Sequence, residues 1–154
     1  KLLPYVDVCI GCDEDIWSLF AQPNINPNRS TTFDYVDYYR DTALSISKKY
    51  ECHTVAIEIR ALASSGVGRW SGMIIRDDSM SETREIMNGE HSGCGDSFAA
   101  GVTLGCLEGW RPSTIINYAL MASVLKSTIP GSINYLTRDE IVSAAGSSLT
   151  LVDY

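Results

Sequence analysis

Short apolar runs separated by a long amphipathic stretch constrain the fold of this chain more than any other feature. The runs 5–10 and 53–59 are rich in β-branched residues, which is typical of strands. Between them, the apolar residues of 33–50 recur near helical spacing and charged residues take the opposite face, as in an amphipathic helix. A strand, a helix and a second strand in this order predict an α/β domain.

The remaining segments extend the same pattern. Acidic residues open a predicted helix at 13–20, and the polar stretch 22–32 predicts an exposed loop. Two β-like runs at 70–75 and 80–86 suggest a hairpin. Three helices are then predicted, at 96–110, at 112–128 and after residue 137. A capping box between Thr137 and Glu140 is expected to start the last helix. We therefore expect one three-layer α/β/α, Rossmann-like domain.

The composition narrows the function classes. The 154 residues suffice for one domain with one core, and no apolar run approaches the roughly 18 residues that a membrane helix needs. A net charge of -7 makes general binding to nucleic acid unfavourable. The five cysteines are odd in number and scattered, which favours a reducing, cytoplasmic setting.

The segment 92–101, Ser-Gly-Cys-Gly-Asp-Ser-Phe-Ala-Ala-Gly, is the best candidate for chemistry. Two glycines flank a small residue directly before a predicted helix, so the backbone can approach a ligand closely. The amides and the positive dipole end of a helix N-terminus form an anion site. Asp96 beside it is a candidate general base for a hydroxyl that attacks a phosphoryl group. The alternative, which the spacing alone favours, is a tight turn with an ordinary helix cap.

The same segment resembles the Gly-Ala-Gly-Asp-Ser-Phe-Ala-Ala-Gly signature of the PfkB, or ribokinase-like, carbohydrate kinases. The similarity extends over nearly the whole chain and is greatest to the 2-keto-3-deoxygluconate kinases. Segments 5–15, 55–60 and 122–131 resemble the strand and acidic turn before the nucleotide half, the strand that reaches the ATP loop, and a late helix and loop. The resemblance implies a ribokinase-like fold and phosphorylation of a sugar or sugar acid, foremost 2-keto-3-deoxygluconate, by ATP with Mg²⁺.

The resemblance also implies roles for individual residues. Asp96 would be the catalytic base, and the amides of Gly93, Cys94 and Gly95 would form the anion hole. The implied nucleotide-binding positions, in the ATP loop and the late helix, are Arg60, Ser64, Gly66, Gly68, Ala122 and Lys126. In the acidic turn, Asp15 would help to hold hydrated Mg²⁺, although Cys12 and Asp15 stand where the family usually has Asn and Glu.

The family fold has a further N-terminal half that supplies most sugar contacts and the lid. We therefore expect residues 1–154 to be the C-terminal nucleotide-binding and catalytic portion, with the N-terminal half absent. The expected partners are the sugar substrate and either a second copy of the chain or that missing half, but no nucleic acid and no membrane. The competing hypothesis is a partial or degenerate kinase domain that binds nucleotide or another chain without catalysis. Ser132, where relatives often carry an acidic residue, favours it.

Four further features have structural explanations that we prefer. Cys9-x-x-Cys12 has metal or redox spacing, but no second pair completes a zinc site. Cys94 is expected to fill space, with an oxidisable thiol as the alternative. Gly101-x-x-x-Gly105 predicts close packing of a helix against the sheet. An aromatic cluster predicts packing, with an oligomer surface as the alternative: Phe33, Tyr35, Tyr38 and Tyr39.

Overall fold

The computed structural model describes residues 2–20, 32–62, 68–77, 79–82, 86–88 and 92–145. A short 3-10 turn (η1, Leu3–Tyr5) precedes the regular elements. The strands are β1 (Val8–Cys12), β2 (Thr54–Leu62), β3 (Gly68–Arg76), β4 (Ser79–Glu82) and β5 (Ile86–Asn88). The helices are α1 (Asp13–Phe20), α2 (Thr32–Tyr50), α3 (Cys94–Leu107), α4 (Pro112–Lys126) and α5 (Arg138–Ala145). Within these ranges, no helix combines the length and apolar character needed to cross a bilayer.

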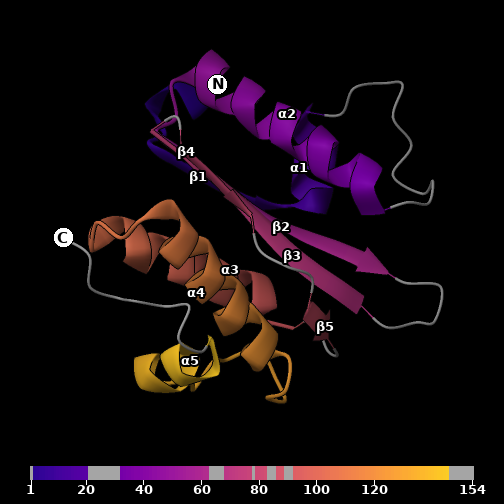
Figure 1. Cartoon of the computed structure of the whole chain (residues 1–154), viewed down its shortest axis with the longest axis vertical. Helices are drawn as coiled ribbons and strands as arrows, with labels where there is room; N and C mark the ends of the chain where they lie inside the picture. Colours follow the sequence, from indigo (N-terminus) through magenta and orange to yellow (C-terminus); the bar gives the residue numbers. More distant parts are fainter. Residues whose placement is uncertain are drawn as a thin grey trace.

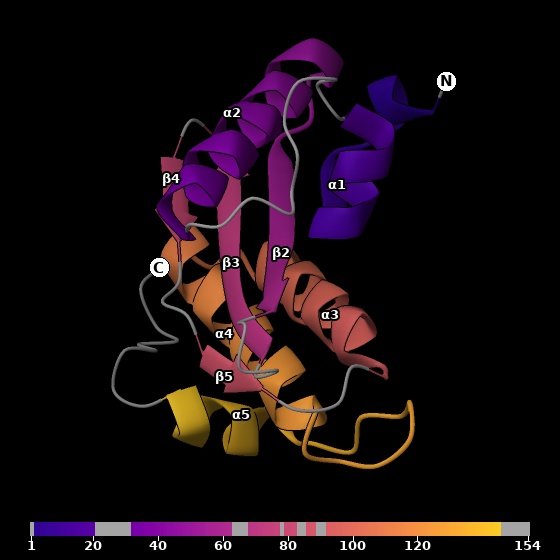
Figure 2. The same ribbon diagram turned by 90° about the vertical axis from the view of Figure 1, so that its right-hand side faces the viewer.

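The strands form one mixed sheet. Its order is β1-β2-β3-β4, and β5 pairs with the start of β3. β1 and β2 are parallel, with Cys12 opposite Glu58, whereas β2 and β4 both run antiparallel to β3. Figure 2 shows β2 and β3 side by side between the helices. Because β1 and β2 end at the same edge of the sheet, residues that follow them are brought together there, as in other α/β folds that bind ligands at strand ends.

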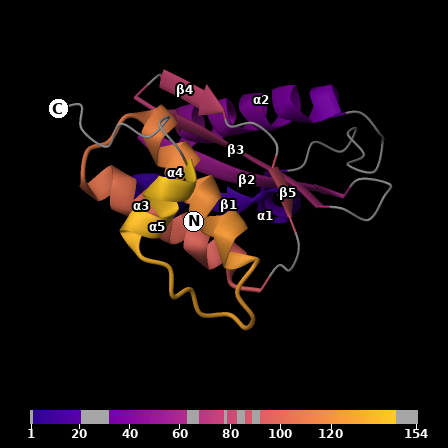
Figure 3. The same ribbon diagram turned by 60° about the horizontal axis from the view of Figure 1, so that its bottom comes forward.

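Helices cover both faces of the sheet, α1 and α2 on one and α3 and α4 on the other (Figure 1). The side chains of β2 alternate accordingly, because successive residues of a strand point to opposite faces. Val55, Ile57 and Ile59 pack with α1 and α2, and Ala56 packs with α3 and α4. The predicted strand and the three-layer α/β/α arrangement are therefore confirmed. α5 lies outside α4, on the side away from the sheet (Figure 3).

Two of the three glycines of α3, Gly101 and Gly105, allow a close approach between helices. A methyl group on Gly101 would lie 2.7 Å from the Cα of Ala119, and one on Gly105 would lie 2.7 Å from Ile115. Both neighbours belong to α4. The predicted close packing is thus present, but the prediction that its partner is the sheet was wrong, because these glycines face the neighbouring helix.

Two other local predictions are confirmed in part. β3 and β4 form the expected hairpin, but the predicted run 80–86 divides into β4 and β5, which pair with opposite ends of β3. Tyr38 and Tyr39 are buried and pack edge to face, with ring centroids 5.1 Å apart, so these two rings contribute to the core. The side chains of Phe33 and Tyr35 lie outside the described residues.

Candidate functional site

The start of α3 has a backbone conformation that requires glycine. Gly93, the residue before the helix, has φ 73°, a left-handed conformation that side chains with a Cβ disfavour. A Cβ at this position would lie 2.0 Å from the carbonyl oxygen of Ser132. The loop after α4 therefore lies directly against the turn that opens α3.

The amides that open α3 precede the hydrogen bonds within the helix. The first hydrogen bond within the helix is donated by the amide of Ser97 to the carbonyl of Gly93, at 3.1 Å. The amides before Ser97 in this turn therefore have no acceptor within the helix. Asp96 lies in this turn with an exposed side chain. The structure thus places the predicted base outside the core, beside the predicted anion hole of Gly93, Cys94 and Gly95.

Side-chain hydrogen bonds join this turn to the loop after α4. The hydroxyl of Ser97 donates to the carbonyl of Gly93 at 2.9 Å and accepts from the amide of Asn134 at 3.0 Å. The carbonyl oxygen of the Asn134 side chain in turn accepts from the backbone of Leu136, at 2.9 Å. Ser97 and Asn134 therefore fix the loop across the start of the helix.

A buried ion pair lies beneath the same turn. Glu58 is 1% exposed, and its carboxylate accepts two hydrogen bonds from Arg60, from Nε at 3.1 Å and from Nη2 at 2.5 Å. The hydroxyl of Ser123 donates to the other carboxylate oxygen. A methyl group on Gly95 would lie 2.9 Å from Nη2 of Arg60. The structure therefore brings together two predicted site residues, Arg60 and Gly95, through direct packing.

Cys94 and its neighbours form the floor of the turn. The Cys94 side chain is buried with Trp70 and Leu120, which supports its predicted role as a space-filling residue. Trp70 also lies under the guanidinium of Arg60, 4.9 Å from the ring centroid. This apolar floor keeps the cation at the boundary between the core and the start of α3.

The two predicted nucleotide-binding residues of α4 are buried. Ala122 is in the core between α4 and α3, and Lys126 has 0% exposure. The amine of Lys126 donates to the carbonyls of Ile129 and Gly131, at 2.8 and 2.6 Å. Lys126 thus braces the loop that contacts Gly93, and direct contact between either side chain and a nucleotide stays a prediction.

Asp15 lies at the start of α1, directly after β1. One of its oxygens accepts from the backbone amide of Cys12 at 3.2 Å and from its thiol at 3.1 Å. Burial is the main reason why the pKa of this thiol is raised above its ordinary value of 9.0. Cys12 and Asp15, which replace the usual Asn and Glu, therefore contact each other, at the same edge of the sheet as Glu58.

The predicted ATP loop is described only at its ends. Ser64 and Gly66 lie outside the described residues, and Gly68 is the first residue of β3, paired with Leu62. Arg60 is paired with Trp70 in the same two strands. The connection between β2 and β3 therefore leaves the sheet at the end that bears Arg60.

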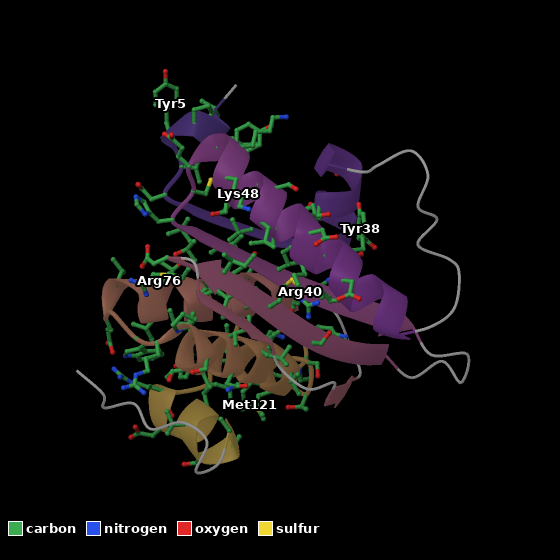
Figure 4. All side chains as sticks on the ribbon, turned by 45° about the horizontal axis from the view of Figure 1, so that its top comes forward. Tyr5, Tyr38, Arg40, Lys48, Arg76 and Met121 are labelled. Carbon is green, nitrogen blue, oxygen red and sulfur yellow. The ribbon has the colours of Figure 1, made fainter. Side chains whose placement is uncertain are left out.

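A pocket of about 460 Å³ lies at the opposite end of α3. Its lining includes Asp7, His53, Arg76 and Leu107, and Figure 4 labels Arg76 at this end of the sheet. The C-terminus of a helix carries the negative end of the helix dipole, and Asp7 and Asp77 line the pocket as well. The dipole end and these two carboxylates oppose the positive charge of Arg76, which makes the pocket less favourable for phosphate than the start of α3.

Several solved structures of sugar kinases have the same architecture as this chain. A 2-dehydro-3-deoxygluconokinase from Thermotoga maritima matches 94% of this chain with a TM-score of 0.79 and 31% identity. A PfkB family carbohydrate kinase from Listeria grayi matches 94% with a TM-score of 0.72 and 28% identity. This chain has the ribokinase-like fold of the PfkB carbohydrate kinases. The predicted fold and the resemblance to this family are confirmed.

The ribokinase-like match covers only part of each kinase. The chain spans 42% of the Thermotoga maritima enzyme and 42% of the Listeria grayi enzyme. Phosphofructokinase-2 from Escherichia coli matches 95% of this chain with a TM-score of 0.70 and 12% identity, and the match covers 43% of the enzyme. At this identity the match shows the fold alone. No protein-family model and no curated protein matches the sequence.

Three residues of the site were missed by sequence reasoning. From the sequence, Glu58 belongs to a predicted strand and Ser123 to the segment 122–131 that resembles the family, and no predicted motif or segment contains Asn134. Their partners lie far along the chain, at separations of 65 residues for Ser123 and Glu58 and 37 for Asn134 and Ser97. The sequence offers one signal for these residues, which is the charged Glu58 within a strand that is otherwise mostly apolar. A charge buried in such a strand needs a hydrogen-bonding partner.

Proposed function

We propose that this chain is the nucleotide-binding and catalytic portion of a sugar kinase that transfers the γ-phosphoryl group of ATP to a hydroxyl of a sugar or sugar acid. The observation that carries the proposal is the start of α3, where an exposed Asp96 and the partly exposed Arg60 cation both adjoin a glycine turn. The likeness to kinases at 31% and 28% identity supports it.

The proposed chemistry uses the first turn of α3 in two ways. The amides of Gly93, Cys94 and Gly95 and the positive dipole end stabilise the negative charge of the transferred phosphoryl group. The hydroxyl oxygen of the sugar bonds to the γ-phosphorus while the bond from this phosphorus to ADP breaks. The carboxylate of Asp96 accepts the proton of that hydroxyl. ATP supplies the phosphoryl group. The remaining contribution of the chain is alignment of the two reactants.

The residues present fit ATP better than they fit a preformed metal site. Backbone amides and a cation converge where phosphates would lie, whereas no group of three or more metal-ligating side chains occurs in the described part of the chain. Mg²⁺ in kinases is held mainly by phosphate oxygens, water and one or two carboxylates. Asp15 has an exposed carboxylate at the same sheet edge and is the proposed side chain for a hydrated Mg²⁺.

The other predicted residues have proposed roles around the nucleotide. Arg60 is proposed to face the nucleotide phosphates, because its guanidinium packs against Gly95. Ala122 and Lys126 are proposed to act through the packing of α4 and the loop after it. Ser64, Gly66 and Gly68 are proposed for the ATP loop on the strength of the family resemblance.

The proposed substrate is 2-keto-3-deoxygluconate. The Thermotoga maritima structure is described as 2-dehydro-3-deoxygluconokinase, and the resemblance of the sequence favours the same sugar acid. The proposed location is the cytoplasm, because all five cysteines are free thiols in the structure and a reducing compartment keeps them so.

The proposed protein partner is the N-terminal half of the family fold, with a second copy of the chain as the alternative. In the described sheet, β1 stands at the end of the strand order and pairs with β2 on one side. An edge strand presents its N–H and C=O groups to another strand. Val8 and Ile10 of β1 are only partly buried. These features, together with the 42% coverage of longer kinases, support the addition of a strand along β1.

A second candidate function is a partial kinase domain that binds nucleotide or another chain without turnover. The 42% coverage of the matching kinases favours it, since closure over the substrate completes the site of lidded enzymes. The two candidates share the nucleotide site and differ in whether Asp96 has a substrate hydroxyl to deprotonate.

ADP release with ATP, Mg²⁺ and 2-keto-3-deoxygluconate tests the proposal. Asp96→Asn is expected to reduce the rate by about a hundredfold or more, the usual contribution of a general base. Asp139→Asn is the matched control, because Asp139 is also an acidic residue in the first turn of a helix, and it should leave the rate unchanged. Equal rates in the wild type and the Asp96 variant would remove the catalytic assignment, and ATP binding without turnover would support the second candidate.

A further inference from the structure

A carboxylate buried under the proposed phosphate site has no role in the chemistry described above. Glu58 lies on β2 and is 1% exposed. Both of its oxygens accept hydrogen bonds, one from the hydroxyl of Ser123 on α4 and the other from Nε and Nη2 of Arg60. Two elements therefore hold the carboxylate, and the carboxylate in turn holds one edge of the guanidinium.

Arg60 is restrained on three sides. Glu58 holds one edge of its guanidinium, and the centroid of the Trp70 ring lies 4.9 Å from the central carbon of the guanidinium. Gly95 packs so closely that a methyl group on it would lie 2.9 Å from Nη2. The side chain nevertheless keeps 27% exposure. A planar guanidinium held in this way has fewer orientations open to it than an unrestrained side chain.

Stability by itself is a weak reason for such a pair. A buried ion pair recovers little more than the cost of removing both charges from water, and an apolar pair of similar volume would often serve the fold as well. The charge of Arg60 does have a clear use here, because the first turn of α3 collects amides and the positive end of the helix dipole at the same place. A fixed cation beside these amides strengthens the attraction for a phosphate chain.

We propose that Glu58 is a positioning residue, which holds the guanidinium of Arg60 against Gly95 so that its charge faces the phosphates of a nucleotide bound at the start of α3. This inference rests on the proposed function, because it takes ATP as the ligand of this site. Glu58 touches neither nucleotide nor sugar and acts through Arg60 alone. Ser123 supports it by fixing the second carboxylate oxygen.

Equilibrium binding of ATP with Mg²⁺ and of adenosine, measured by calorimetry, tests the inference. Glu58→Gln keeps the shape but removes the charge that orients Arg60, so ATP affinity should fall roughly tenfold, the range of a hydrogen bond to a charged group. Adenosine has no phosphate, and its affinity should stay the same. A purely structural role of Glu58 would weaken both ligands together and would overturn the inference.

Two further variants keep the test decisive. Arg60→Lys retains a cation over Glu58 but loses the planar two-point contact, so it should also weaken ATP and spare adenosine even if the Glu58 variant does not fold. In the Arg60→Ala background, Glu58→Gln should cause no further loss of ATP affinity, because the residue through which it acts is gone. An additional loss there would contradict the proposed route.

The outcomes separate this inference from the proposed function. A wild-type chain that binds ATP while the Glu58 and Arg60 variants bind it equally well would overturn the positioning role and leave the kinase proposal standing. A wild-type chain that binds neither ATP nor adenosine at millimolar concentration would overturn the nucleotide site itself, and the positioning role with it.

Discussion

Gly93 shows how a single residue determines the geometry of the candidate site. Its left-handed φ of 73° turns the chain into α3, and the space above its Cα is occupied by the backbone of Ser132. Substitution by any residue with a Cβ therefore meets two separate costs, strain in the turn and a collision with backbone that has no flexible end to move. The second cost falls on the loop that Lys126 braces.

Gly93→Ala is expected to destabilise the fold by more than the roughly 1–2 kcal/mol that a left-handed conformation costs an L-residue. Gly109→Ala provides the control, since Gly109 has nearly the same φ, 71°, with nothing within 4 Å of the added carbon. Urea denaturation of the two variants measures the difference. If both lose the same free energy of unfolding, Ser132 does not restrict this position.

At the residue scale, the sequence allowed Asp96 and the glycines around Cys94 to be chosen as a site, because their types and order are local. It did not reveal Glu58. The alternation of β2 predicts which face Glu58 occupies but not what covers that face, and the covering hydroxyl of Ser123 comes from a helix 65 residues later. The pairing of Arg60 with Gly95 likewise depends on tertiary packing.

At the scale of elements, a local signal predicted the start of α5 correctly. The amide and hydroxyl of Thr137 both donate to the carboxylate of Glu140, at 2.8 and 2.7 Å, and the amide of Glu140 points back to the Thr137 hydroxyl at 3.4 Å. The run 80–86 could not be divided correctly from the sequence, because the break between β4 and β5 depends on which end of β3 each strand meets. The glycines of α3 were assigned to the wrong neighbour for a similar reason.

The capping box makes the start of α5 sensitive to acid. The hydrogen bonds from Thr137 lower the pKa of Glu140 below its ordinary value of 4.5. Since the pKa is lower in the folded state, the stabilisation is complete above the unfolded value and is lost as the pH falls through the folded one. The protection factors of the amides of residues 138–141, which correct the exchange rate for its intrinsic dependence on pH, should therefore fall below about pH 4.5, and in Glu140→Gln they should not depend on pH in that range. Unchanged protection factors of the wild type across this range would show that the box does not hold the helix.

At the scale of the whole molecule, the two ends of the sheet differ in what they offer a ligand. One end has the start of α3, the end of β2 with Arg60, and Asp15 after β1. The other has a pocket lined by Asp7, Arg76 and the last turn of α3. The direction of the helix dipole and the amides at the start of α3 favour the first end for phosphate. The order of strands and helices in the sequence predicted the three α/β/α layers. The structure was needed to learn which residues lie at each end of the sheet.

Titration of the ¹⁵N-labelled chain with ATP and Mg²⁺ tests most directly whether the start of α3 is a phosphate site. The amides of Gly93, Cys94, Gly95 and Asp96 should shift most, because phosphate oxygens would accept hydrogen bonds from this turn. Inorganic sulfate at matched ionic strength controls for nonspecific effects of anions. Shifts confined to the last turn of α3 and the neighbouring Asp7 and His53, with the first turn unchanged, would contradict the proposal.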